Sequence, residues 1–241
     1  MKGIITMGML MFLSVITFGQ IQTQNMLKEI KCTPPQFAGV ERTILVKSNF
    51  QTIDDYLNKY VTYPQEDVMN DVQGTEVIRF IVNPSGYLTD FDVINSVSAN
   101  IDEEVIRILK ATNGMWKPGY NDDKPEAMEK EVSLVFKINE SNNLDFSYLA
   151  KKYFAKGNEI FFTKSNPKKA LKYFDRAMVL LPKDKAVLVQ RGLARYEIGN
   201  KEGAFRDWTR VKTLGGFESN GYLENFGNLK GYADLVRTLE N

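Results

Sequence analysis

Hydrophobic residues between positions 51 and 140 follow two spacings, and these predict the order helix, strand, strand, helix, strand. Over residues 52–64 the apolar positions recur every three or four residues, which predicts a helix. These positions are Ile53, Tyr56, Leu57 and Tyr60. Pro64 ends that helix, because its ring removes a donor, and it can occupy the first position of a short helix over 64–72.

Two alternating segments, residues 74–83 and 87–96, predict a β-hairpin. The first is rich in β-branched and aromatic residues, with Ile78, Phe80 and Val82 on one face, and the second places Phe91 and Val93 on one face. The segment 83–86, Asn-Pro-Ser-Gly, has Pro at the second and Gly at the fourth turn position, as a type I turn prefers.

A second helix is predicted over residues 100–112, and a third strand over 131–139. Asn100 can cap this helix, and its apolar stripe packs inward. The stripe consists of Ile101, Val105, Ile108 and Leu109. In the strand, Val132, Leu134, Phe136 and Ile138 alternate with polar residues. Between helix and strand, we expect Trp116 to pack under the sheet–helix layer, Pro118-Gly119 to turn the chain, and 120–125 to be solvated.

This order favours a small three-stranded antiparallel sheet with helices on one face, which buries the apolar stripes. An α+β domain over residues 51–140 is therefore expected, preceded by an extended lead-in over 20–50 with no clear period. One strand of so small a sheet remains an edge, and an exposed edge is either protected or used to bind an extended peptide.

Several short motifs stand in the order and spacing of the TonB C-terminal domain family, which this segment resembles. They are Tyr-Pro at 63–64, VQGTEVIRFIVNPSG at 72–86, DEEVIRIL at 102–109, WKPG at 116–119 and Lys-Pro at 124–125. The upstream PPQFAGVE at 34–41 resembles the lead-in of energy-transducer TonB proteins of Bacteroidetes-type bacteria. The resemblance implies a periplasmic domain that captures an extended segment of an outer-membrane receptor and takes part in energy-coupled transport.

The resemblance also implies where that segment binds, since in the family it adds as a strand beside the last strand of the sheet. The implied edge is Glu131, Val132, Ser133, Leu134, Val135, Phe136 and Lys137. Tyr63 and Pro64 match the family's Tyr-Pro motif and become possible receptor contacts, although a packed helix start explains them equally well.

Residues 146–241 carry an internal repeat. Ala170, Phe174 and Ala177 recur 34 residues later as Ala204, Trp208 and Val211, and a period of about 34 residues is that of tetratricopeptide repeats. The first unit has one extra residue near its inter-helix turn, around 163–167. Because stacked helical hairpins need about three repeats for stability, we expect a C-terminal helix within 222–241 to cap an all-α domain.

The repeat positions are expected to form core, whereas basic side chains of the first unit offer a surface for an acidic or C-terminal peptide. This basic repeat surface comprises Lys151, Lys152, Lys156, Lys168, Lys169 and Lys172. A solvated face is the alternative interpretation.

The N-terminus has the pattern of a secretory signal: Lys2, an apolar run over residues 4–18, and a small residue at Gly19. We expect cleavage after Gly19 and a periplasmic mature protein. An inner-membrane anchor formed by residues 4–18 is the alternative, at the short limit of roughly 17–25 residues for a spanning helix.

The composition limits which kinds of functional site the chain can form. The chain has no histidine and one cysteine, Cys32, so neither a zinc cluster nor an internal disulfide is expected. A net charge of +1 gives no reason to expect nucleic acid as a partner.

The charge is unevenly distributed along the chain. Residues 51–140 contain 17 acidic and 8 basic residues, and residues 146–215 contain 6 acidic and 16 basic residues. Such opposite charges suggest two domains that attract each other or bind different partners.

Two non-enzymatic hypotheses remain, because no phosphate loop, nucleophile motif or matched acid–base pair occurs and no cofactor is implied. The first is a TonB-like periplasmic component that binds a receptor peptide. The second is a cell-envelope scaffold whose tetratricopeptide repeats bind other proteins. The chain has only eight prolines and no long Pro-rich spacer, which argues against force transmission.

Overall fold

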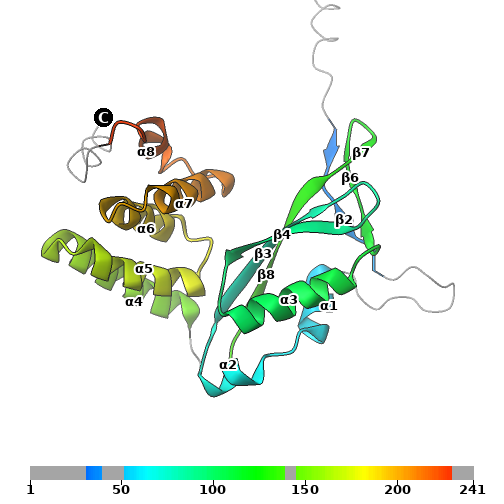
Figure 1. The fold of residues 1–241 in the computed structure, drawn as a ribbon, viewed down its shortest axis with the longest axis horizontal. Coiled ribbons are helices and arrows are strands. Elements are labelled where there is room, and N and C mark those ends of the chain that lie inside the picture. Colours follow the sequence, from blue (N-terminus) through cyan, green and yellow to red (C-terminus); the bar gives the residue numbers. More distant parts are fainter. Residues whose placement is uncertain (1–30, 40–51, 139–144, 230–241) are drawn as a thin grey trace, which may run out of the picture.

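The structure is a computed structural model, and it describes residues 31–39, 52–138 and 145–229. The signal segment predicted over 1–19, most of the lead-in and residues 230–241 of the segment expected to hold the capping helix (222–241) lie outside these ranges. As Figure 1 shows, the fold is α+β: a small antiparallel sheet with helices is followed by an all-α region.

The main sheet contains three antiparallel strands in the order β4-β3-β8. They are β3 (Gly74–Val82), β4 (Leu88–Asn95) and β8 (Met128–Phe136). The hairpin predicted over 74–96 is present, and its turn closes with Gly86 N–H donating to the Asn83 carbonyl at 2.9 Å. The last strand begins at Met128, three residues before the predicted start at Glu131, because all of Met128–Phe136 finds partners on β3.

Helices α1 (Ile53–Tyr60) and α3 (Ala99–Ala111) cover one face of the sheet, and α2 (Gln65–Met69) lies between them in sequence. Pro64 precedes α2 as its N-cap rather than occupying its first helical position. The cap of α3 is Ser98, not Asn100: the Ser98 hydroxyl accepts from the Ile101 N–H at 3.2 Å. Ser and Asn are both common N-cap residues. Ser98 is the cap here because the helix begins at Ala99.

The predicted apolar stripes form the core between these helices and the sheet. The buried set includes Ile53, Leu57, Ile78, Phe80, Val82, Ile101, Val105, Ile108, Leu109, Val132, Leu134 and Phe136. Trp116 joins it at 5% exposure, and its ring packs edge-on against Phe80 and Phe37. Its indole N–H donates to the Thr112 hydroxyl at 2.9 Å, so its one polar atom is satisfied. The prediction that Trp116 packs inward is confirmed.

The stretch around Trp116 is more ordered than expected. Short strands β6 (Gly119–Asn121) and β7 (Lys124–Glu126) form a hairpin whose turn residues, Asp122 and Asp123, both have positive φ. The prediction that residues 120–125 are solvated is confirmed, because all of them are exposed, but the hairpin that they form was not predicted.

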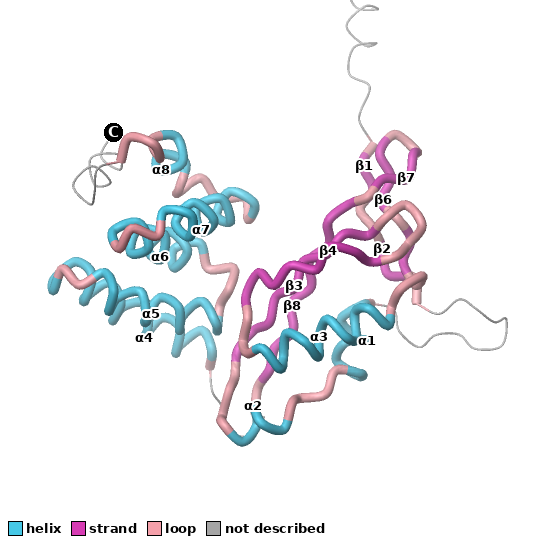
Figure 2. Tube along the Cα trace, in the orientation of Figure 1, coloured by secondary structure: helices cyan, strands magenta, loops and turns pink. Residues whose placement is uncertain are grey.

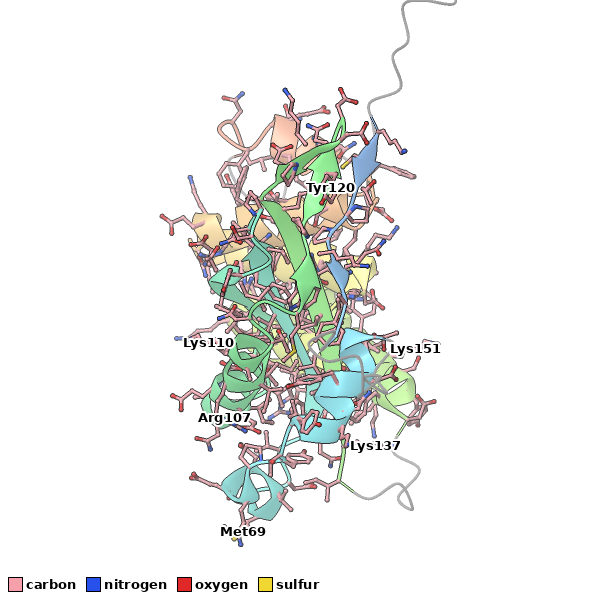
Figure 3. The ribbon with its side chains drawn as sticks, turned by 90° about the vertical axis from the view of Figure 1, so that its right-hand side faces the viewer. Met69, Arg107, Lys110, Tyr120, Lys137 and Lys151 are labelled. Carbon is pink, nitrogen blue, oxygen red and sulfur yellow. The ribbon has the colours of Figure 1, made fainter. Side chains whose placement is uncertain are left out.

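The lead-in supplies partners to this stretch. Strand β1 (Cys32–Thr33) pairs with β6, and β2 (Gln36–Phe37) pairs with β5 (Trp116–Lys117). In Figure 2 these strands form an extension beyond one end of the main sheet. Figure 3, which views the molecule at a right angle to Figure 1, places Tyr120 in this extension and Met69 of α2 at the opposite end. In the described part of the lead-in, residues 31–39, two pieces of two residues each form strands, which is too short for a periodic pattern.

The all-α region contains two antiparallel helix pairs. These are α4 (Phe146–Asn158) with α5 (Pro167–Leu180), and α6 (Lys185–Glu197) with α7 (Lys201–Thr213), followed by the short α8 (Asn220–Glu224). The extra residue was predicted in the turn at 163–167, but a π-helical segment, η1 (Glu159–Thr163), lies just before that turn, and its i→i+5 bonding accommodates an added residue.

The repeated positions form the core of these helix pairs. Ala170, Phe174, Ala177, Ala204, Trp208 and Val211 are all fully buried. Gly157 and Gly192 lie directly against Phe174 and Trp208, because an added Cβ would come within 2.5 and 2.3 Å of those side chains. Tyr222 of α8 stacks on Trp208 with ring centroids 4.9 Å apart, so α8 covers part of the second pair.

The all-α region covers the face of the sheet that α1 and α3 leave open (Figure 1). Val77 is therefore fully buried although it points away from the first core. The Thr75 hydroxyl donates to the Leu180 carbonyl at 2.9 Å, and a Cβ on Gly74 would clash with Val179 at 2.6 Å. We expected helices on one face only, but the sheet is covered on both.

Candidate functional site

Strand β8 is an outer strand of the main sheet. Its residues pair with β3 on one side, and among the described residues no strand pairs with its other side. A strand with one unpaired side presents a row of backbone donors and acceptors, which is the geometry that accepts an added strand.

Two side-chain hydrogen bonds reveal which residues of β8 present these groups. The Thr75 carbonyl accepts from the Asn95 side chain on the β4 side, so it points away from β8. Thr75 stands opposite Val135 in the register. The two therefore form a non-hydrogen-bonded pair, in which the polar backbone groups of both residues point away from each other.

The neighbouring hydrogen bond agrees with this alternation, since Ile138 N–H points toward the β3 side and donates to the Gln73 side chain at 3.0 Å. The N–H and C=O groups of the odd-numbered residues from Glu131 to Lys137 therefore face the outer edge. Those of the even-numbered residues face β3.

The side chains of the predicted edge divide in the same alternation. Val132, Leu134 and Phe136 are buried in the core. Val135 is 59% exposed, Lys137 is exposed, and Ser133 is half-buried. An added strand would thus meet backbone groups along the edge and the Val135 side chain beside it.

Glu131 has a role that sequence reasoning missed. Its carboxylate is bound by Arg210 at 2.7 Å and lies 3.3 Å from Lys183, both in the all-α region. Burial acts to raise the pKa of Glu131, but the hydrogen bonds and positive charges of Arg210 and Lys183 lower it overall. The opposite net charges of the two halves were the only sequence signal for this contact.

Tyr63 lies at the end of the same strand. Its ring packs edge-on against Phe136 with centroids 5.2 Å apart, and its hydroxyl donates to the Val72 carbonyl. Burial raises the pKa of this hydroxyl to about 12, with Asp67 and Asp71 adding to the increase. Pro64 is half-buried beside it. Tyr63 thus supports the end of β8 from within the fold.

Glu76 is a buried carboxyl on β3, opposite Leu134 of β8, and only 1% exposed. One oxygen accepts from the Val97 N–H at 2.9 Å. Burial raises its pKa from 4.5 to about 8; the Val97 hydrogen bond acts in the opposite direction, and the negative charge of Asp102 adds to the increase. Glu76 is therefore protonated at neutral pH.

Stability should consequently fall as pH rises. Because the folded pKa exceeds the unfolded one, the contribution of Glu76 is fully present below about pH 4.5 and is lost as pH rises through 8. Each pKa unit corresponds to about 1.4 kcal/mol, so the change amounts to a few kcal/mol.

Glu76→Gln keeps an oxygen for Val97 and cannot ionise. Its free energy of unfolding relative to wild type, measured by urea denaturation, should rise between pH 5 and 9; a pH-independent difference would contradict the assignment.

The basic repeat surface consists of exposed side chains on α4 and α5, and Figure 3 labels one of them, Lys151. Lys156 forms an ion pair with Glu159 at 2.7 Å. The remaining five lysines form no ion pair within the described ranges, and they extend into solvent.

Other chemistry was sought in the described part of the chain. No group of three or more His, Cys, Asp or Glu there is arranged to hold a metal ion. No described helix has the length and apolar character needed to cross a bilayer. Cys32 is exposed as a free thiol on β1.

Comparison with known proteins found a similarity that includes β8. Residues 59–138 match the family model described as Gram-negative bacterial TonB protein C-terminal. The NMR solution structure of the TonB C-terminal domain of Helicobacter pylori is 17% identical, covers 36% of this chain and 91% of that chain, and gives a TM-score of 0.30. A search of curated proteins found no match. The matched segment runs from α1 to the residues just after β8 and does not include the all-α region.

Proposed function

We propose that this chain is a TonB-like periplasmic protein that takes part in energy-coupled transport. In this role it binds an extended peptide of an outer-membrane receptor by strand addition along β8. The family match over 59–138 supports the transport-associated role. The single observation that carries the binding mode is the outward direction of the backbone groups of Glu131, Ser133, Val135 and Lys137.

The arrangement around the edge favours a preformed site. Tyr63 supports one end of β8, and Glu131 is bound to the all-α region. The strand is thus held from both faces of the sheet, so little ordering entropy is lost when a peptide pairs with it. Under this proposal Tyr63 positions the strand through its contact with Phe136, and Pro64 beside it is a possible receptor contact.

A second function has its own support in the all-α region. The two helix pairs related by 34 residues, with Gly157 and Gly192 at matching close contacts, support an assignment as tetratricopeptide repeats. Such repeats commonly bind other proteins. The alternative is therefore a non-transducing envelope scaffold that binds an acidic peptide through Lys151, Lys152, Lys168, Lys169 and Lys172.

The proposed strand addition is tested by Val135→Pro. Because the Val135 N–H points outward, proline removes a donor from the edge while the ladder to β3 keeps its donors. We expect crosslinking of the full chain to an outer-membrane receptor, in envelopes of the native host, to fall at least about tenfold, the equivalent of about 1.4 kcal/mol. Mass spectrometry of the crosslinked peptides identifies the receptor segment.

Two further variants make the result decisive. Val135→Ala removes the same side chain but keeps the N–H, so it should crosslink like wild type, and circular dichroism should show both variants folded. Lys168→Glu combined with Lys172→Glu tests the scaffold. Unchanged crosslinking by Val135→Pro together with loss in the double lysine variant would reject strand addition in favour of the alternative.

A further inference from the structure

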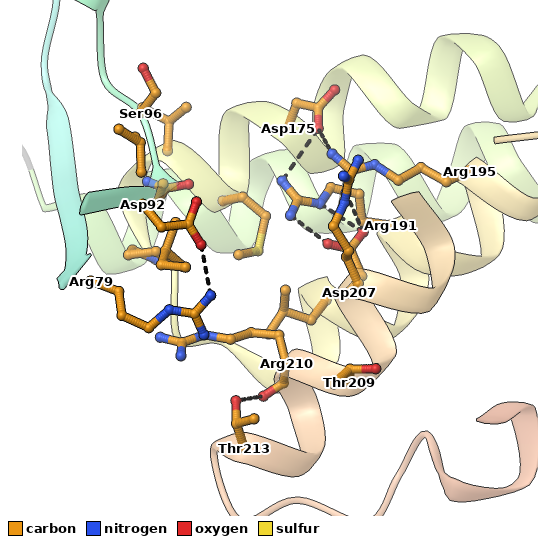
Figure 4. Close-up of a pocket in the computed structure, with 18 of the residues that line it drawn as sticks. Arg79, Asp92, Ser96, Asp175, Arg191, Arg195, Asp207, Thr209, Arg210 and Thr213 are labelled. Carbon is orange, nitrogen blue, oxygen red and sulfur yellow. Dashed lines mark hydrogen bonds and ion pairs between the residues drawn. The ribbon is translucent and has the colours of Figure 1, made fainter. Parts of the chain in front are cut away.

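A cleft of about 580 Å³ lies between the second face of the sheet and the all-α region (Figure 4). Strands β3 and β4 line one wall, and α5, α6 and α7 line the other. We call it the interdomain cleft. It lies away from the outer edge of β8 and separate from the basic repeat surface.

The lining of the interdomain cleft is rich in arginine. Five guanidinium groups contribute to it, together with three carboxylates from Asp92, Asp175 and Asp207. The arginines are Arg79, Arg191, Arg195, Arg206 and Arg210. Arginine binds carboxylate and phosphate groups through paired N–H donors, so a cleft lined by five arginines can bind an anion. Glu129 and Glu131, which lie 3.8 Å from Arg79 and 2.7 Å from Arg210, offset part of this positive charge.

Most of these arginines are held in fixed positions. Asp207 accepts from Arg191 at 2.6 and 3.0 Å and from Arg195 at 2.8 Å. Arg79 is bound to Asp92 at 2.7 Å. Because these guanidinium groups are pre-positioned, a ligand would lose little free energy in ordering them.

Burial and then the charge of neighbouring Arg191 lower the pKa of Arg195. An anion bound beside Arg195 would favour its charged form.

Three polar groups in the lining lack an internal partner. Arg206 is exposed and has no ion pair among the residues that the structure describes. The Thr209 hydroxyl oxygen and the Arg210 Nε are buried and have no hydrogen-bond partner. Arg210 uses its Nη2 for Glu131, so its Nε is the group that remains. Buried side-chain atoms without a partner also occur elsewhere in the described residues, for example in Asp67, Ser133 and Gln190, so Arg206 is the lining group that is both unpaired and open to a ligand.

We propose that the interdomain cleft binds a small molecule carrying at least two carboxylate or phosphate groups. Its volume falls within the roughly 300–1,000 Å³ typical of small-ligand sites. In this site Arg206 contacts the anion, and the pre-positioned Arg191 and Arg195 supply further N–H donors. The site does not require strand addition, because its lining contains no residue of β8, although Arg210 also binds Glu131 of that strand.

Isothermal titration calorimetry of the full chain tests the site with citrate and inorganic pyrophosphate as separate probes. We expect saturable binding with one ligand per chain, weakened by added salt. Stronger binding of citrate would identify a polycarboxylate site, and stronger binding of pyrophosphate a phosphate site.

Two variants separate the cleft from general surface charge. Arg206→Glu should weaken binding at least about tenfold, because it replaces an unpaired guanidinium by a carboxylate. Lys212→Glu makes the same change of charge on an exposed residue of α7 outside the lining and should bind like wild type.

The proposal is overturned if neither probe binds at concentrations up to about 10 mM. It is also overturned if Lys212→Glu weakens binding as much as Arg206→Glu, since the effect would then come from overall charge. Hexaglutamate serves as a third probe. Binding of hexaglutamate alone would reject a small ligand and indicate an acidic protein segment instead.

Discussion

Replacing Trp116 by alanine is expected to lower the free energy of unfolding by about 3–5 kcal/mol, the usual cost of removing a large buried ring. Trp116 is 5% exposed and contacts the rings of Phe37 and Phe80, which come from the lead-in and the main sheet. Its removal leaves a cavity where three separate segments meet. It also leaves the Thr112 hydroxyl without its indole donor.

Urea denaturation followed by circular dichroism measures this loss. Trp116→Phe is the matched control, because it keeps an aromatic ring and removes the indole N–H, and it should cost less than the alanine variant. In both variants the remaining tryptophan, Trp208, reports separately on the all-α region by fluorescence. A loss below about 1 kcal/mol in Trp116→Ala would show that the ring does not join these segments.

Replacing Asp207 by alanine is expected to cost a similar amount, about 3–5 kcal/mol, for a different reason. Asp207 is 3% exposed and holds two arginines, Arg191 and Arg195, each with a distance below 3 Å. Without it these half-buried guanidinium groups lose the carboxylate that compensates their burial. The unpaired charges, rather than the lost contact, account for most of the cost.

Asp175→Ala provides the control within the same cluster. The Asp175 side chain is half-exposed and lies 3.5 and 3.7 Å from the same two arginines, so its removal should cost less than about 1 kcal/mol. Thermal unfolding of the two variants measures the difference. Equal losses in both would show that the cluster acts through total charge and not through the buried position of Asp207.

Local patterns predicted the elements of the main sheet well. The apolar residues of α3 and β8 are regularly spaced because each element buries one face in the core between the helices and the sheet. The spacing along the chain therefore predicts which residues are buried. The 34-residue recurrence of Ala170, Phe174 and Ala177 likewise reflects contacts between neighbouring helices, which are close in sequence.

Predictions failed where a residue's partner is distant in sequence. Residues 120–125 form a hairpin partly because Cys32–Thr33 pairs with β6, some 90 positions earlier in the chain. Neither segment has an alternating pattern long enough to reveal this pairing. The cap of α3 was misplaced by two residues, since Ser98 and Asn100 are both good caps and only the start of the helix decides between them.

Sequence alone was sufficient to predict an α+β unit followed by a helical repeat, because periodic burial within each element is a local property. The environment of β8 required the tertiary structure. The outward direction of the Val135 N–H follows from the register with β3, and the pairing of Glu131 with Arg210 joins residues 79 positions apart. The interdomain cleft arises in the same way, because its arginines come from a strand and two helices that meet only when the second face of the sheet is covered.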